Sequence, residues 1–228
     1  PYTTLFRSLS VCPTESTSQG AQAVFKEETA DMAETIEKYS KWVEATRHFW
    51  DAESESAAKY RRICSSPDFD STQDERILRR FWNYETQRSM SMILDAIPLR
   101  PQWRCVEIGS GIGRLLKPLA GMCEQAIGYD VSSNMVTFSR EYLAGVSNAE
   151  VRHNDGCSLP GLEDASVDFV FSHLAFQHLT LFEVVDAYLD EIARVLKPGG
   201  YVRIQNWRDE HIPVKERLKN LLRPVLGR

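Results

Sequence analysis

Cys105-Val106-Glu107-Ile108-Gly109-Ser110-Gly111-Ile112-Gly113-Arg114 is the stretch that decides the fold of this chain. A short apolar run surrounds an acid and is followed by glycines at every second position. This order predicts a buried β-strand that turns sharply into a helix, with the backbone of the turn open to a ligand. Glycine suits the turn because a Cβ would block both the tight bend and the close approach of a cofactor.

The spacing of the glycines distinguishes between two kinds of nucleotide site. A dinucleotide fingerprint places its third glycine three positions after the second, which is position 114 here, and that residue is Arg114. The pattern Gly-x-Gly-x-Gly after an acid therefore departs from the dinucleotide fingerprint.

A second acid follows the next predicted strand. Residues 125–129 form a short strand that ends at Asp130, which lies 21 residues past Gly109. This is about where a doubly wound fold places an acid that accepts hydrogen bonds from a ribose diol. The alternative is that Asp130 only caps the next helix, a role that Ser132 or Ser133 fills equally well.

Three later segments continue the alternation of helices and strands. A predicted strand over 150–153 precedes Asn154-Asp155-Gly156, and residues 167–173 form a predicted buried strand. Residues 193–202 contain a helix end, a Pro-Gly-Gly turn and a new strand. The whole order predicts an α/β domain.

These segments, in this order over residues 103–206, resemble the class I S-adenosylmethionine-dependent methyltransferases. The resemblance implies a doubly wound, mostly parallel sheet with helices on both faces, an N-terminal helical lid, and S-adenosyl-L-methionine as the cofactor. It implies cofactor contacts from Glu107, Gly109, Ser110, Gly111, Gly113, Asp130, Val131, Met135, Asn154, Asp155, Gly156 and Ser172. In such a site the residue at 107 orients the methionine end, the residue at 130 holds the ribose, and the residue at 135 packs on adenine.

The same resemblance directs attention to the end of the strand over 167–173, where family members meet the substrate. His173 is the better candidate for a catalytic base, because a near-neutral imidazole suits proton transfer. We interpret His178 first as a hydrogen-bonding residue at a helix start and second as catalytic. Phe176 and Gln177 are expected to border the pocket.

Two helices are predicted before the glycine turn, over 32–62 and from Ser71 toward Ile97. Trp82, Tyr84 and Arg88 are candidates to line a substrate pocket, and the alternative is that aromatic residues at helical spacing belong to the core. We therefore expect an N-terminal helical cap over 32–98 and a cofactor-binding methyltransferase domain over 99–228.

Both chain ends give separate expectations. Residues 1–8 resemble translated sequencing-adapter DNA and the first Met is Met32, so we expect residues 1–31 to be spurious or disordered. A class I sheet closes with two more strands after the helix predicted over 210–226, and none follows it. We expect a C-terminally truncated fragment that lacks these last two strands.

Composition restricts the location and the partners. The net charge is −5 without a long run of Lys or Arg, which makes a nucleic-acid partner unlikely. The five cysteines show neither paired nor metal-type spacing, so we expect no metal site and a reducing, cytoplasmic location. No apolar stretch reaches the length of about 18 residues that a membrane span needs.

The expected function is methyl transfer to oxygen or nitrogen of a small molecule or sugar. The segment after the strand over 167–173 lacks the Asn/Asp-Pro-Pro-aromatic motif of exocyclic-amine DNA methylases, and resembles broad bacterial groups of methyltransferases. The alternatives are a protein or RNA methyltransferase, or an inactive partner subunit with the same fold.

Overall fold

The computed structural model describes residues 39–52 and 75–205. The chain divides into two compact units, residues 1–44 and residues 45–228. In the first unit the described residues, 39–44, are helical. The second unit holds residues 45–52 of the same helix and an α/β core. The predictions for residues 1–31, for the helix start near Ser71 and for the helix over 210–226 lie outside the described residues.

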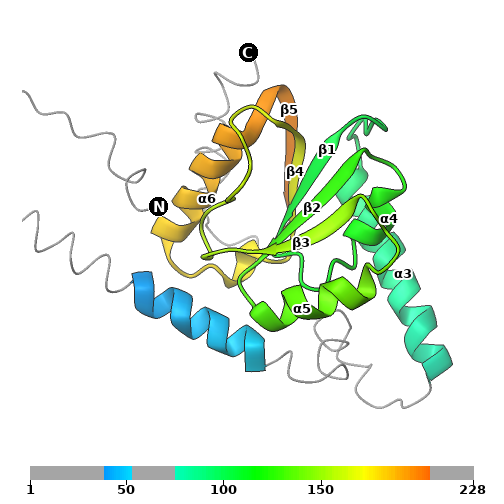
Figure 1. Ribbon diagram of the computed structural model, residues 1–228, viewed down its shortest axis with the longest axis horizontal. Coiled ribbons are helices and arrows are strands. Elements are labelled where there is room, and N and C mark those ends of the chain that lie inside the picture. The colour runs from blue at the N-terminus through cyan, green and yellow to red at the C-terminus, as the bar shows by residue number, and fades with distance from the viewer. Residues whose placement is uncertain (1–38, 53–74, 206–228) are drawn as a thin grey trace, which may run out of the picture. The chain divides into compact units, whose positions relative to one another are not determined.

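The core is a five-stranded parallel sheet with the strand order β3-β2-β1-β4-β5 (Figure 1). The strands are β1 (Arg104–Ile108), β2 (Gln125–Asp130), β3 (Ala149–His153), β4 (Val167–His173) and β5 (Leu196–Gln205). The order reverses between β1 and β4, and in open parallel sheets ligands bind at the carboxyl ends of the strands at such a point. The predicted doubly wound α/β architecture is confirmed.

Helices cover both faces of this sheet (Figure 1). They are α3 (Glu75–Leu94), α4 (Leu116–Ala120), α5 (Ser133–Tyr142) and α6 (Phe182–Val195), with the short 3₁₀ helix η3 (Phe176–His178) after β4. One buried apolar cluster joins α3, α4 and α5 to β1 and β4, while α6 lies on the opposite face. Because both faces are covered, the central strands are almost continuously apolar rather than alternating.

The helix after the glycine turn, predicted to follow the turn directly, begins later than expected. Residues 111–115 form turns, and α4 begins only at Leu116. Gly113 has a φ of +81°, which interrupts right-handed helical geometry before that point. Pro118 lacks an amide donor but is tolerated in the first turn of a helix.

The Pro-Gly-Gly segment is not the separate turn that the sequence suggested. Leu196 pairs with Val167 and Tyr201 pairs with Phe169, so residues 197–200 bulge out of a continuous β5. Lys197 in this bulge directs its Nζ at both carboxylate oxygens of Asp168, at 2.9 Å each. The segment therefore attaches β5 to β4.

Asp168 also accepts a hydrogen bond from the amide of Arg104, at 2.9 Å from Oδ2. The carboxylate thus joins the amino ends of β1, β4 and β5. Its side chain is mostly buried, so solvent screens this ion pair less than a surface pair. The amino ends of three strands are fixed in register at one point.

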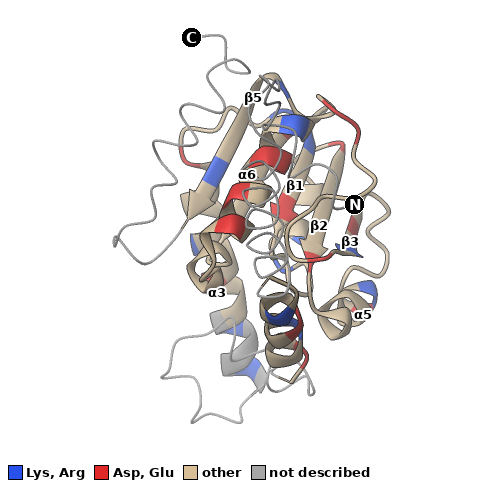
Figure 2. Cartoon of the chain, turned by 90° about the vertical axis from the view of Figure 1, so that its left-hand side faces the viewer, with Lys and Arg blue, Asp and Glu red and all other residues tan. Residues whose placement is uncertain are grey.

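The outer surface of α6 is acidic (Figure 2). Glu183, Asp186 and Asp190 follow one another at helical spacing on the same side of this helix.

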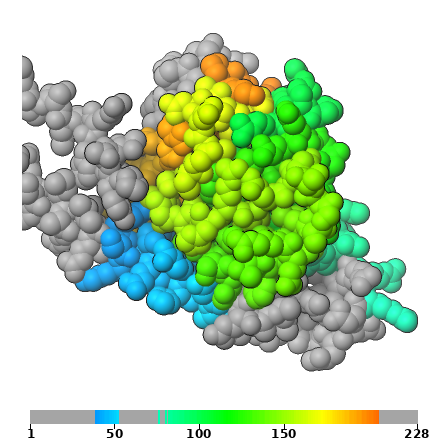
Figure 3. All heavy atoms as spheres, viewed as in Figure 1, coloured from blue at the N-terminus to red at the C-terminus, as the bar shows by residue number. Residues whose placement is uncertain are grey.

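In the space-filling view, atoms of α5 and of the segment between β3 and β4 lie side by side on one face (Figure 3). Among the described residues, no helix is long and apolar enough to cross a membrane.

Gly128 in β2 provides a test of the packing beneath the glycine turn. A Cβ at this position would lie 2.3 Å from Ser110 Oγ and 2.7 Å from Leu116 Cδ1. We expect Gly128→Ala to lower the free energy of unfolding by about 1–3 kcal/mol through overpacking, measured by urea denaturation. Gly121→Ala is the control, because its nearest neighbour, Pro118 O, is at 3.5 Å and its φ is −74°. Equal effects of the two substitutions would contradict this description of the packing.

Candidate active site

The glycine turn after β1 is held in a left-handed conformation. Gly109, Gly111 and Gly113 have φ values of +73°, +54° and +81°. A Cβ on Gly109 would lie 2.2 Å from the Cβ of Ala175, so the loop after β4 packs directly on the turn. A Cβ on Gly111 would meet only Met135 Sδ, at 3.9 Å, so its positive φ rather than crowding requires glycine there.

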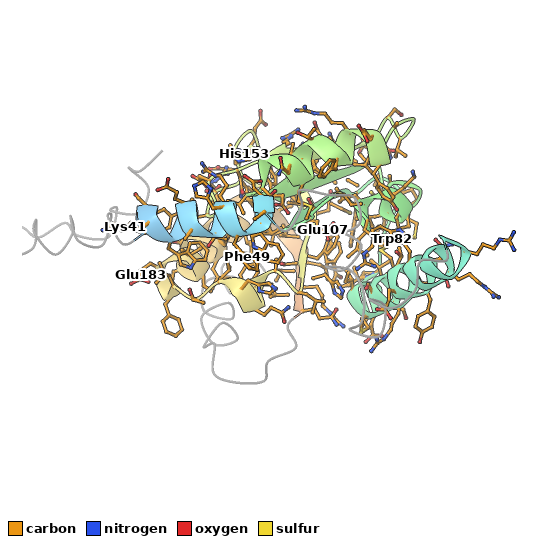
Figure 4. All side chains as sticks on the ribbon, turned by 90° about the horizontal axis from the view of Figure 1, so that it is seen from below. Lys41, Phe49, Trp82, Glu107, His153 and Glu183 are labelled. Atoms are coloured by element: carbon orange, nitrogen blue, oxygen red, sulfur yellow. The ribbon has the colours of Figure 1, made fainter. Side chains whose placement is uncertain are left out.

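Two polar side chains at this turn are buried without a hydrogen-bond partner among the described residues. Glu107 is 2% exposed and its Oε2 is unpartnered, and Ser110 is 6% exposed with an unpartnered Oγ. Burial raises the pKa of Glu107 well above its usual range, and the nearby Arg114 guanidinium offsets this only in part (Figure 4). Leaving such groups unsatisfied costs free energy, so both are available to a polar ligand.

Asp130 connects the glycine turn to the end of β2. Its Oδ2 accepts from the amide of Gly111 at 2.7 Å, and its Oδ1 accepts from the amide of Ser132 at 2.9 Å. Burial raises the pKa of Asp130, and these two hydrogen bonds oppose the rise. Each oxygen of a carboxylate has two lone-pair positions, so Asp130 retains the capacity to accept from a diol.

The start of α5 follows directly. Ser132 Oγ accepts from the amide of Met135 at 3.2 Å, so Ser132 rather than Asp130 is the N-cap. Met135 is buried beside Gly111, and the carbonyl of Val131 lies 3.1 Å from His153 Nε2. These residues lie together on the β2 side of the glycine turn, and the cofactor contacts of Val131 and Met135 stay predictions.

The segment after β3 is held by its own hydrogen bonds. Asn154 Nδ2 donates to Ser158 O at 2.8 Å and to the Tyr188 hydroxyl at 3.0 Å, while its Oδ1 accepts from the Gly156 amide at 3.3 Å. Burial raises the pKa of Asp155, but hydrogen bonds from Ser158 and Cys157 outweigh it and lower the pKa below its usual range. The described bonds thus give Asn154 a role in shaping the loop, and its cofactor contact stays a prediction.

On the other side of the turn, β4 ends at Ser172 and His173. Ser172 Oγ donates to Ile108 O at 2.8 Å, which joins the carboxyl ends of β4 and β1. The next residue after His173, Leu174, has a φ of +65°, which is unfavourable for a residue with a Cβ. Its amide donates to Gln205 O at 3.0 Å, and this bond to β5 supports the conformation.

His173 is half-buried against β5. Its Nδ1 lies 3.0 Å from Oε1 of Gln205, whose Nε2 donates to Met92 Sδ at 3.2 Å. With the amide oriented in this way, Nδ1 carries the proton and Nε2 is left as an acceptor. Burial lowers the pKa of His173 to about 4, so the ring is neutral at physiological pH.

The other predicted residues of this side differ in exposure, because Phe176 is buried, Gln177 is half-buried and His178 is exposed. His178 is exposed at the end of η3, where the ring of Trp50 packs edge-on against it at 5.0 Å between centroids. Gln177 Nε2 lies 3.2 Å from the ring of His178. His178 does not start a helix, because it ends η3 and α6 begins four residues later.

The three candidate pocket residues on α3 lie in different surroundings. Trp82 is half-buried and donates from Nε1 to the Tyr142 hydroxyl at 3.3 Å, whereas Tyr84 is 61% exposed. Arg88 is exposed and pairs with Glu85 at 3.6 Å. The structure therefore does not bring Tyr84 together with the buried part of the site.

Sequence reasoning missed several residues that shape this region. Arg114 is 9% exposed, and its guanidinium donates to Thr86 and Ser89 of α3 at 3.3 Å each. It also lies over the ring of Trp82, at 5.8 Å from the centroid. The signal in the sequence that could have indicated a role for Arg114 is its place as a basic residue directly after the glycine turn.

Known proteins resemble this chain over the same region. Residues 106–204 match the family model described as a methyltransferase domain. Malonyl-[acyl-carrier protein] O-methyltransferase from Methylococcus capsulatus is 33% identical over 102 residues, which are 44% of this chain and 36% of that protein. Demethylmenaquinone methyltransferase from Staphylococcus aureus is 30% identical over 143 residues, 60% of this chain and 58% of that protein. The matched region is less than two thirds of either relative.

A solved structure of the [4+2]-cyclase SpnF matches with a TM-score of 0.50 at 21% identity. The match covers 64% of this chain and 57% of that chain, and it is a likeness of fold alone.

The burial of His173 predicts a pH dependence of stability. Below the ordinary imidazole pKa of 6.5 the unfolded chain binds a proton that the folded protein, with a pKa of about 4, does not bind. The contribution of this residue is therefore present above pH 6.5 and is lost as the pH falls toward 4. Urea denaturation at pH 7 and pH 5 should show a smaller loss of stability for His173→Gln than for the wild type. An equal loss of stability in His173→Gln and in the wild type would refute the assignment.

Proposed function

We propose that this chain, which belongs through residues 106–204 to the class I S-adenosylmethionine-dependent methyltransferase family, moves a methyl group to oxygen or nitrogen of a small molecule or sugar. The observation that carries the proposal is the pair of buried, unpartnered polar atoms at the glycine turn, Glu107 Oε2 and Ser110 Oγ. A cofactor with its own polar groups satisfies both.

The residues around the turn fit S-adenosylmethionine. When bound, this cofactor supplies a methyl group that is already activated by attachment to a sulfonium. Glu107 accepts a hydrogen bond from a donor such as an ammonium group, and Asp130 accepts from ribose hydroxyls. Gly111 leaves room for the close approach of a ligand, and Met135 offers a polarizable apolar surface beside it.

His173 is the proposed base on the acceptor side. Its neutral ring keeps Nε2 ready to take a proton from an attacking hydroxyl or amine, and Gln205 holds the tautomer. The chain also has to align the acceptor with the methyl group and exclude water. The burial of Glu107 and the packing of the Ala175 loop on the glycine turn suit the site to these tasks.

Relatives and surface charge support a small acceptor. The names of the two similar enzymes refer to malonyl-[acyl-carrier protein], which carries a small acyl group, and to demethylmenaquinone. The acidic surface of α6 disfavours a polyanion beside it (Figure 2). The other interpretations are methyl transfer to protein or RNA, and an inactive partner subunit. Because a [4+2]-cyclase shares the fold, only an assay of methyl transfer itself identifies the reaction.

Calorimetric titration with S-adenosylmethionine and S-adenosylhomocysteine tests the cofactor. We expect both to bind, and we expect Asp130→Ala to weaken binding by about 1–3 kcal/mol through loss of charged hydrogen bonds. Asp190→Ala removes an exposed acid of α6 and should leave binding unchanged. Absence of binding by the folded wild type would sink the proposed function, whereas equal binding by Asp130→Ala would refute only the ribose assignment.

Transfer of a tritiated methyl group in a dialysed bacterial extract, supplemented with its own small-molecule fraction, tests the acceptor class. We expect the label to appear in the small-molecule fraction with the wild type and to be much reduced with His173→Gln. Label in protein or RNA would favour the alternative acceptors, and no label despite tight cofactor binding would favour the inactive partner.

A further inference from the structure

Two consecutive residues of the N-terminal helical segment contact both sides of the glycine turn. Asp51 reaches α5, which follows β2, and Trp50 reaches η3, which follows β4. In Figure 4 this part of the pale blue helix lies between the green α5 and the yellow segment of η3 and α6. We call Trp50 and Asp51 the strap.

The contacts of Asp51 gather at the N-terminus of α5. Its Oδ1 accepts from Ser132 Oγ at 2.6 Å and from the Asn134 amide at 3.3 Å, and its Oδ2 accepts from Ser133 Oγ at 3.4 Å. The backbone carbonyl of Asp51 accepts from Asn134 Nδ2 at 3.0 Å. A carboxylate at this place is favoured further by the dipole of α5. Asp51 therefore fixes the residues that directly follow the ribose candidate Asp130.

The contact of Trp50 lies on the opposite side. Its ring meets His178 edge-on, with 5.0 Å between centroids and 84° between planes. Phe49 packs edge-on against Trp50 in turn, at 5.1 Å. His178 belongs to the same connection as Ala175, whose methyl group covers Gly109.

The sheet order makes this pair of contacts informative. Since β1 lies between β2 and β4, anything that contacts both following elements spans the turn that follows β1. That turn carries Glu107 and Ser110, whose unpartnered atoms are buried although no described residue bonds them. The strap thus contacts the two elements that flank the glycine turn.

We propose that Asp51 and Trp50 are positioning residues that hold the methyl donor in its site, so that docking of the strap and binding of the donor stabilise each other. The inference rests on the proposed function, since it takes S-adenosylmethionine and its product as the ligands. Asp51 sets the α5 wall and Trp50 sets the η3 wall. Because coupling between two binding equilibria is reciprocal, a donor that binds more tightly when the strap is docked also shifts the strap toward its docked state by the same factor.

The release rate of S-adenosylhomocysteine from the full chain tests this inference by stopped-flow displacement. We expect Asp51→Ala to release it about tenfold faster than the wild type, within the usual range of such couplings. Asp51→Asn keeps an acceptor for Ser132 Oγ and should give an intermediate rate. Glu183→Ala is the matched control, because it removes an exposed acid from the first turn of α6. Its release rate should equal that of the wild type.

Hydrogen exchange of the wild type gives a second measurement that needs no variant. We expect S-adenosylhomocysteine to slow exchange of the amides of residues 45–52 and of Asn134. Two results would overturn the inference about the strap while leaving the proposed function intact. One is a release rate of S-adenosylhomocysteine from Asp51→Ala and Asp51→Asn that equals the wild-type rate. The other is amide exchange of residues 45–52 at the same rate with and without the ligand. If the folded wild type binds neither ligand, the proposed function and the strap are both wrong.

Discussion

The hydrogen bond from the Gly111 amide to the Asp130 carboxylate is the constraint on which the rest of the site depends. A left-handed turn of three glycines loses more backbone entropy on folding than a turn of other residues, so it persists only where its amides are fixed. The amides of Gly109 and Ser110 both donate to Tyr129 O, one residue before Asp130. The end of β2 therefore defines the shape of the turn after β1, and with it the position of Glu107.

In the proposed function, the site divides at this constraint into a donor side and an acceptor side. The donor side is built on β1, β2 and α5, and its groups are carboxylates and backbone amides. The acceptor side is built on the end of β4, where Gln205 and Met92 orient the half-buried imidazole of His173. The two sides meet where the Ala175 methyl group packs on Gly109. This close contact joins the glycine turn to the loop that follows His173.

Most of the fold followed from local patterns in the sequence, and most of the unpredicted features involve long-range contacts. The apolar run that begins at Cys105 located β1 to within one residue, because both faces of the sheet are covered there and the strand is buried from Cys105 to Ile108. The bulge in β5 was missed because it depends on the pairing register with β4. Asp51 and Gln205 carry no local signal, since their partners lie 81 to 83 and 32 residues away. Trp82 and Tyr84 were both candidates on one predicted helix. The helical pattern alone does not say which face of that helix packs against the core.

The junction at Asp168 has a consequence for how such a domain can change over time. Arg104 and Lys197 bond this carboxylate at the amino ends of their strands, the end of the sheet opposite to the glycine turn. The alignment of three strands therefore does not rely on the connections that follow their other ends. Those connections can vary in length and composition while the sheet keeps its register. New acceptor specificities can thus arise in the loops without rebuilding the platform that carries the donor.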